Sequence, residues 1–305
     1  MRAGWVLLWL SAVPAALLRF DRAAAQAWQE GGLVQLRSAL AALSSRFAFP
    51  LCDLLFFALC ASVLGCLLSR RRAPLPYLAA GLVLSLSLTW GAPCALSESA
   101  PQPDAQELFA LCLVLSQEAA DVRPASLAFD RAQIAREAAR LCQSAVTPKA
   151  ALFPGLMKAL GLAGWWSPLT SEAVVDLSMG ALNLPFALCH ELMHAAGVAG
   201  EAQAHFLAYQ ACMRGDGVFR YSAAMNALWH AMRALRAMDG AAWEEVLACM
   251  DEAVLHDLAR MNGLSEPDGG PLQRAQDLLT GLYQHITGSE PYDAFAGWLA
   301  QEKFA

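Results

Sequence analysis

Two histidines and a glutamate stand together in the stretch His190-Glu191-Leu192-Met193-His194. If this stretch is helical, the two imidazoles project from one face about one turn apart, so their ring nitrogens can converge on one zinc ion. Glu191 can then lie beside the metal without ligating it, where a general base must be to take a proton from zinc-bound water. The pattern predicts a zinc site with Glu191 as its catalytic residue.

A zinc site that does chemistry needs a third protein ligand and an open position. Gly197 ends the first helix, and a second helical stretch begins at Glu201, so Glu201 is the predicted third ligand. The alternative is a solvated glutamate favoured by the helix dipole. His205 lies one turn after Glu201 and is a candidate ligand, a partner that orients a ligand, or a core residue. Gly200 stands where an extended motif would place a third histidine.

Apolar residues surround the histidines, which predicts that this helix is buried almost all round. Buried imidazoles and carboxylates carry a desolvation cost of several kcal/mol unless they are paired or bind a metal. The alternative is a surface helix with two incidental histidines. The apolar neighbours are Phe186, Ala187, Leu188, Cys189, Leu192, Met193, Ala195 and Ala196.

The composition leans toward a membrane protein. Hydrophobic residues make up 57% of the 305 residues and charged residues 16%, against about 45–50% and about 25% in typical soluble domains. Residues 1–92 hold eight Lys and Arg against three Asp and Glu, whereas residues 93–305 hold thirteen against twenty-four, within a net charge of -6. These features exclude disorder, collagen and nucleic-acid binding, and they divide the chain into a basic membrane anchor over 1–92 and an acidic domain over 93–305.

Three apolar runs, near residues 4–20, 47–68 and 75–91, are the predicted transmembrane segments. The first is short enough to be a cleaved signal peptide, but charged residues follow it where a cleavage region should be uncharged, so an uncleaved anchor is favoured. Asp53 is the lone acid of the second run. We expect it to stay hydrated near the interface, with a functional role as the alternative.

The basic cluster Arg70-Arg71-Arg72 lies in a very short loop between the second and third runs. Positive charge in short loops marks the cytoplasmic side of a membrane. The sequence therefore predicts a multi-pass protein of the cell membrane with a cytoplasmic amino terminus, a segment 21–46 outside, and an extracytoplasmic domain after Trp90. The lipid bilayer is a predicted partner.

The domain after the linker Pro101-Gln102-Pro103 is predicted to be mainly α-helical. The exception is a short strand near 173–177, just before the metal helix, whose exposed edge would pair with an extended substrate. Six cysteines in residues 93–305 permit disulfides, with buried free thiols as the alternative. Helical periodicity covers 104–120, 129–146, 155–163, 184–196, 201–214, 218–238, 241–261 and 271–287.

The pattern HELMHAAGVAGEAQAHFLAY resembles zincin peptidases that use a glutamate as third ligand. Over most of its length the chain resembles a bacterial membrane family known as domain-of-unknown-function family 3810, whose members are considered zinc peptidases. The resemblance implies a membrane-anchored, zincin-like metallopeptidase in which His190, His194 and Glu201 bind Zn²⁺ and Glu191 is catalytic. The supporting residues are Phe49-Pro50, Asp53, Trp90-Gly91, Leu184-Pro185-Phe186, Ala204-His205-Phe206-Leu207-Ala208 and Phe219-Arg220-Tyr221-Ser222.

Two residues depart from the family pattern. The family usually has an acid where Gln203 stands and a small Asn or Asp where His205 stands. Neither departure changes the three predicted ligands. The hydrogen bonds around the ligands are expected to differ from those of the family.

The predicted function is zinc-dependent hydrolysis of peptide or protein substrates outside the cytoplasm. The oxyanion of such a reaction needs a donor, and Tyr221, His230, Tyr283 and His285 are candidates that the sequence does not rank. The main alternative is an inactive sensor or scaffold in which the metal staples two helices. A transporter component ranks last, because a single membrane acid makes a poor ion path.

Overall fold

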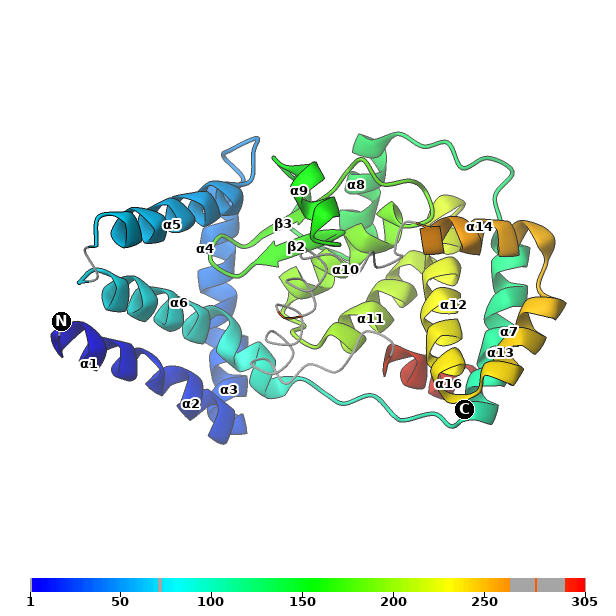
Figure 1. Cartoon of the computed structure of the whole chain (residues 1–305), viewed down its shortest axis with the longest axis horizontal. Coiled ribbons are helices and arrows are strands. Elements are labelled where there is room, and N and C mark those ends of the chain that lie inside the picture. The colour runs from blue at the N-terminus through cyan, green and yellow to red at the C-terminus, as the bar shows by residue number, and fades with distance from the viewer. Residues whose placement is uncertain (1, 71–72, 264–277, 279–293, 305) are drawn as a thin grey trace.

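The computed structural model describes residues 2–70, 73–263, 278 and 294–304. The chain is mainly helical (72%), with three helices at its N-terminal end that are candidate membrane spans and a small sheet of three strands. The predicted fold class is therefore confirmed. Figure 1 shows the apolar helices projecting from one end of a helical body.

Three apolar stretches are long enough to cross a membrane: Ala3–Phe20, Leu51–Leu68 and Leu75–Leu96. The first consists of α1 (Arg2–Ser11) and α2 (Val13–Phe20), which are separate because Pro14 has no N–H to continue the helix. The second is α5 and the third is α6. The predicted segments agree within a few residues, except that α6 continues through Trp90 and across the expected domain boundary.

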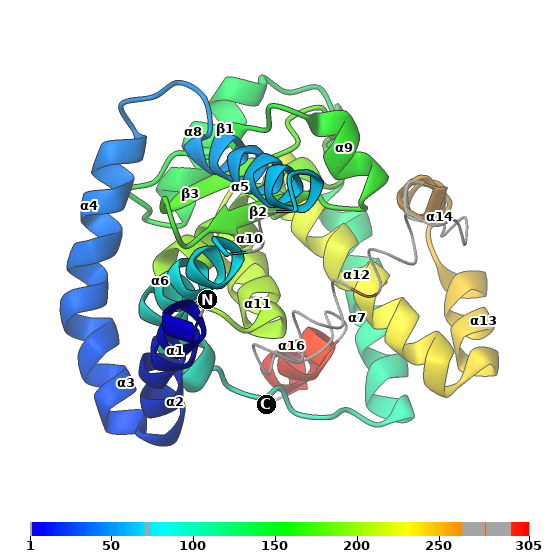
Figure 2. The same cartoon turned by 60° about the vertical axis from the view of Figure 1, so that its left-hand side comes forward.

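The segment between the first two spans forms one bent helix rather than a loop. It consists of α3 (Arg22–Trp28), a π-helical turn η1 (Gln29–Leu33) and α4 (Val34–Ser44). Trp28 donates from Nε1 to the carbonyl of Leu88 in α6 at 2.8 Å. This helix runs across the end of the spans and along the side of the body (Figures 1 and 2). It therefore flanks the candidate spans and the body on one side (Figure 2).

The body contains nine described helices and the sheet. The helices predicted at 184–196, 201–214 and 218–238 are found within one residue, whereas the helix predicted at 241–261 is two helices, because the Asp251 carboxylate caps a new one. The helix predicted at 271–287 lies outside the described residues, apart from position 278. The helices are α7 (Ala105–Val122), α8 (Arg131–Leu141), α9 (Pro154–Ala159), α10 (Leu184–Ala196), α11 (Glu201–Met213), α12 (Val218–Met238), α13 (Gly240–Cys249), α14 (Glu252–Gly263) and α16 (Phe295–Phe304).

The predicted strand before the metal helix is present, but it is not an edge strand. The strand β3 (Glu172–Val175) lies in the middle of the sheet, parallel to β1 (Lys149–Ala150) and antiparallel to β2 (Gly164–Ser167). Val174 faces Lys149 on one side and Trp165 on the other. The expectation that this strand pairs with substrate is therefore wrong for β3. Among the described residues, β2 holds the edge position next to α10.

The sheet is joined to the second span through buried polar contacts. The Glu172 carboxylate accepts hydrogen bonds from the backbone N–H groups of Leu51 and Cys52 at 3.0 and 2.8 Å, and it pairs with Lys149 at 2.7 Å. It thus caps the positive end of α5. Asp53 is buried and accepts a hydrogen bond from the Leu152 backbone at 2.9 Å. The expectation that Asp53 stays hydrated is wrong, because this acid ties the span to the body.

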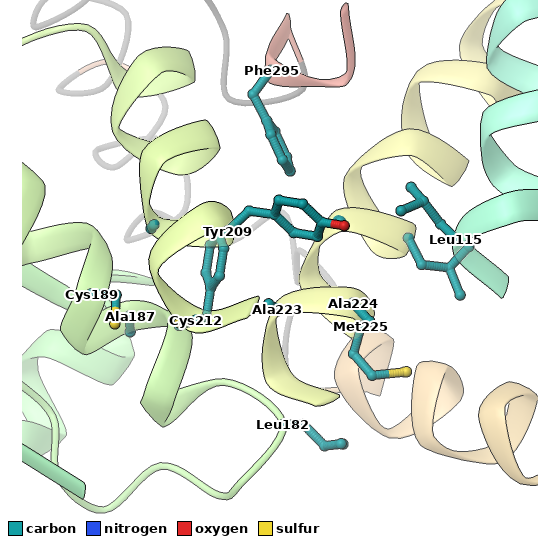
Figure 3. Packing of buried hydrophobic residues seen from close by; sticks show 14 of the residues in the cluster. Leu115, Leu182, Ala187, Cys189, Tyr209, Cys212, Ala223, Ala224, Met225 and Phe295 are labelled. Atoms are coloured by element: carbon teal, nitrogen blue, oxygen red, sulfur yellow. The ribbon is translucent and has the colours of Figure 1, made fainter. Parts of the chain in front are cut away.

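The main core lies between α7, α10, α11, α12 and the C-terminal helix α16. Figure 3 shows part of it, with Leu115, Met225 and Phe295 coming from three of these helices. All cysteines are free thiols, so the disulfide alternative is not observed. Cys112, Cys189 and Cys212 are fully buried and act as small hydrophobic core residues.

Candidate metal centre

The helix α10 carries both histidines and is held at each end. Pro185 stands in its first turn, where a missing N–H costs nothing. Ser222 of α12 accepts a hydrogen bond from the Phe186 backbone at 3.2 Å and donates to the Leu182 carbonyl at 2.9 Å. At the other end, Gly197 takes a left-handed conformation (φ 108°) that glycine adopts without strain. Every residue from Leu184 to His194 is buried, as the sequence predicted.

The helix α11 places its first residue against α10. Ala202, Ala204 and Ala208 are buried, and their small side chains let the two helices approach closely. The N-cap Gly200 provides no side-chain hydrogen bond, and Glu201 is buried rather than solvated at the helix start. The carboxylate therefore points into the protein, toward the histidines.

His190, His194 and Glu201 come together in one buried group, the only set of three such potential ligands among the residues described. The two Nε2 atoms lie 3.0 Å apart. Oε2 of Glu201 lies 3.2 Å from Nε2 of His190 and 3.5 Å from Nε2 of His194. Two imidazoles and one carboxylate thus direct their donor atoms at a common point, and this is a donor set that divalent zinc accepts.

When no metal is bound, the Glu201 carboxylate determines how His190 and His194 are charged. Burial raises the pKa of Glu201, but the neighbouring imidazoles outweigh burial and hold it well below its usual range. Burial lowers the pKa of His194, but Glu201 outweighs it and raises the value to about 9. His190 has a lowered pKa because it is buried next to His194. One cationic charge therefore compensates the buried carboxylate, and a metal ion would supply that charge instead.

Glu191 lies fully buried beside this group, and its Oε2 has no hydrogen-bond partner within the described residues. Burial raises the pKa of Glu191 to about 8. Its side chain fits because Gly164 of β2 has no Cβ: a Cβ there would lie 2.7 Å from Cγ and 2.8 Å from Oε1 of Glu191. The glycine thus leaves room for a carboxylate that is not among the three converging ligands.

The neighbouring groups orient the histidines. Nδ1 of His194 is bonded to the Val198 carbonyl at 2.7 Å, which leaves Nε2 to face Glu201. His205 is not part of the converging group; its ring packs 4.3 Å from that of His190, and its Nδ1 is bonded to the Glu201 carbonyl at 3.0 Å. His230 follows behind, 5.0 Å from His205 between ring centroids.

The structure describes two of the four candidate oxyanion donors, Tyr221 and His230. The Tyr221 hydroxyl donates to Asp257 at 2.7 Å in a buried pair, so it is already engaged. His230 belongs to the histidine row behind the candidate ligands. Tyr283 and His285 lie outside the described residues.

Residues from distant segments complete the surroundings, and the sequence did not indicate them. Trp90 of α6 packs on the His194 ring with centroids 5.9 Å apart, and on Trp166 of β2 at 4.6 Å. The Arg37 guanidinium of α4 lies over both indole rings. In the sequence, Trp90 was considered only as the end of the predicted membrane anchor and as part of the pair Trp90-Gly91. The paired tryptophans in Gly164-Trp165-Trp166-Ser167 were the available signal.

Fold and site together define a mainly helical protein with candidate membrane spans and a buried cluster that could bind a metal. A family model described as "Protein of unknown function (DUF3810)" matches residues 102–299, so the chain belongs to this family. No curated protein and no solved structure matches the chain.

Proposed function

We propose that the protein is a membrane-anchored zinc-dependent peptidase. The observation that carries the proposal is the convergence of His190, His194 and Glu201. Beside them lies a separate carboxylate, Glu191, whose Oε2 has no hydrogen-bond partner in the part of the chain that the structure describes. A purely structural cluster has no need of that second acid, whose burial costs free energy. The same four residues fill the roles that the sequence motif assigns to a hydrolase.

The residues fit zinc by their chemistry. His190 and His194 would offer Nε2, and Glu201 would offer one carboxylate oxygen. Zinc held there supplies a Lewis acid that acidifies water and polarises a carbonyl oxygen. His194 is kept in the correct tautomer by Val198, and the row formed by His205 and His230 packs behind His190.

Glu191 moves the protons in the proposed reaction. Its free Oε2 accepts the proton of the attacking water, and the protonated carboxyl then delivers that proton to the leaving amine nitrogen. Because Glu191 lies against Gly164, the edge strand β2 runs past the reacting group. An extended peptide pairing with β2 would bring a backbone carbonyl to this point.

The alternative is a sensor or scaffold in which the metal staples α10 to α11. A closed structural site would require a further protein ligand. His205 and Cys189 are the nearby residues that could act as a fourth ligand, but among the described residues neither belongs to the converging group. This favours an open position and therefore catalysis.

We place the spans in the cell membrane and the body outside the cytoplasm. The support is the basic loop after α5, since short cationic loops stay in the cytoplasm. The start of α1, the end of α5 and the start of α6 lie at the same end of the candidate spans, away from the body (Figure 1). Substrate cleavage would then take place near the outer leaflet, at the level of α4.

Metal content and activity test the proposal together. The full chain, purified in detergent and supplied with zinc, should hold about one zinc per chain and hydrolyse members of a peptide library. A chelator should abolish hydrolysis, and added zinc should restore it. Zinc binding without any hydrolysis would support the scaffold, and absence of a bound transition metal would overturn both functions.

Replacing Gly164 with alanine should lower kcat about 100-fold while leaving the zinc content unchanged. The new Cβ would displace Glu191, and a misplacement of about 1 Å of a catalytic group costs about that much. Steady-state kinetics with metal analysis provides the measurement. Gly155→Ala is the matched control, because no atom lies near a Cβ at that position. Equal kcat in both variants would contradict the role given to Glu191.

A further inference from the structure

Arg37 is a buried cation without an anionic partner. It lies on α4, its side chain reaches the end of α10, and only 9% of the residue is exposed. No carboxylate pairs with it among the described residues, although a buried charge normally requires a partner. Burial lowers the pKa of Arg37 to about 10, which leaves the guanidinium charged at neutral pH.

The neighbours of Arg37 satisfy it only in part. Nη2 donates to the Thr89 carbonyl at a long 3.5 Å, and Nε has no acceptor among the residues that the structure describes. Nη1 lies against Gly197, where a Cβ would collide with it. The negative end of the α10 dipole stabilises the positive charge of Arg37. It does not supply a hydrogen-bond acceptor for the Nε–H group. The site therefore still lacks an acceptor.

A second unpartnered donor lies beside the first. Trp166 is buried, and the Arg37 guanidinium lies 5.3 Å from its ring centroid. Within the described ranges, Nε1 of Trp166 has no acceptor. Residues two apart on a strand share a face, so Trp166 points to the same side of β2 as the space at Gly164 that Glu191 fills. Two side chains with donors that lack acceptors in the described part of the chain thus lie close together, near the proposed catalytic carboxylate.

We propose that Arg37 and Trp166 form a subsite for a carboxylate of the substrate, about two residues from the scissile bond. This rests on the proposed peptidase function. The spacing follows from β2, because Trp166 comes two residues after Gly164 and a strand advances about 3.3 Å per residue. Trp90 links the two sites, with its ring 5.9 Å from both the His194 ring and Cζ of Arg37.

The chemistry of the subsite selects among substrates. A carboxylate can accept from both a guanidinium and an indole N–H, whereas a positively charged amino terminus would be repelled by Arg37. The carboxylate has two sources in a peptide: an Asp or Glu side chain, or the free C-terminus. The first would make an endopeptidase selective for acidic positions, and the second would make an enzyme that trims peptide ends.

A peptide panel tests the subsite and separates the two sources. Octapeptides with a single Glu or Gln moved along the chain are each prepared with a free or an amidated C-terminus. Wild-type protein should prefer the peptides that carry the required carboxylate by about 10-fold to 100-fold in kcat/KM, the range of a hydrogen bond to a charged group. Dependence on Glu position identifies a side chain, and dependence on the free C-terminus identifies the peptide end.

Arg37→Met should remove this preference while the zinc content stays at the wild-type level, and Trp166→Phe should weaken it. Arg46→Met is the matched control, since Arg46 is an exposed cation just after α4. Arg37→Lys keeps the positive charge and should retain part of the preference. Such partial retention would show that the loss in Arg37→Met does not come from misfolding. An unchanged preference in Arg37→Met, or a dependence on anionic lipid rather than on peptide charge, would overturn the subsite.

Binding measured without turnover separates failure of the subsite from failure of the peptidase function. In the zinc-loaded Glu191→Gln protein, peptides with the carboxylate should change the tryptophan fluorescence near Trp166 at concentrations about 10-fold lower than their neutral partners. If this difference is found but no peptide is hydrolysed by wild type, the subsite stands and the peptidase function falls. If peptides are hydrolysed without any carboxylate dependence, the peptidase function stands and the subsite falls.

Discussion

Replacing Glu191 with glutamine should reduce peptide hydrolysis by about 10²-fold to 10⁴-fold without loss of zinc. The amide has nearly the shape of the carboxylate, but it takes up no proton from water, and general base catalysis contributes about this factor. The three converging ligand atoms belong to other residues, so the metal should be retained. Activity assays and metal analysis on the same preparation provide the measurement.

The control for this variant is Glu244→Gln on α13, an acid in a helix remote in sequence from the motif. It should keep wild-type activity and zinc. Full activity in the Glu191 variant would show that another group acts as base. Equal inactivity of wild type and variant, with zinc bound in both, would favour the scaffold over the enzyme.

The metal helix could be predicted because its signal is local. A spacing of four residues puts both histidines on one helix face, and the glycine at 197 marks the helix end. Glu201 could be predicted as the third ligand because a helix begins at this residue. Its approach to His190 could be predicted from the small residues on that helix. Because these features are separated by only a few residues, they can be recognised from the sequence alone.

The surroundings of the site could not be predicted, because they depend on contacts between distant segments. Arg37 of α4 lies against Gly197 although the two are far apart in the sequence, and Trp90 of α6 packs on the His194 ring. The strand β1 has only two residues, and β2 (Gly-Trp-Trp-Ser) lacks the β-branched run that marked β3. Because neither β1 nor β2 was recognised, the strand before the metal helix was expected to be an edge.

Asp53 illustrates the same limit. In sequence it is a single acid in an apolar run, for which hydration at an interface is the ordinary explanation. In the structure Asp53 accepts from Leu152, and Glu172 caps the same end of α5. Both acids therefore dock the body onto a span. If the spans are in a membrane, this contact fixes the height of the metal centre above it.

Replacing His194 with alanine should lower zinc affinity by at least about 100-fold and abolish hydrolysis. One of three converging donors would be lost, and the remaining pair, His190 and Glu201, would hold a divalent ion weakly. Glu201→Gln should act in the same direction with almost no change in volume. Zinc titration of the chelator-treated protein provides the measurement, and His256→Ala, whose side chain is 72% exposed, is the matched control.

Thermal stability distinguishes a lost ligand from a damaged fold. A metal that binds the folded protein stabilises it by mass action, so zinc should raise the Tm of wild type and of His256→Ala but not that of His194→Ala. Without metal, the histidine variant also leaves Glu201 with a single buried imidazole partner, His190. Its metal-free Tm should therefore fall below that of metal-free wild type. A zinc-dependent rise in Tm that survives both ligand substitutions would place the metal elsewhere and contradict the centre.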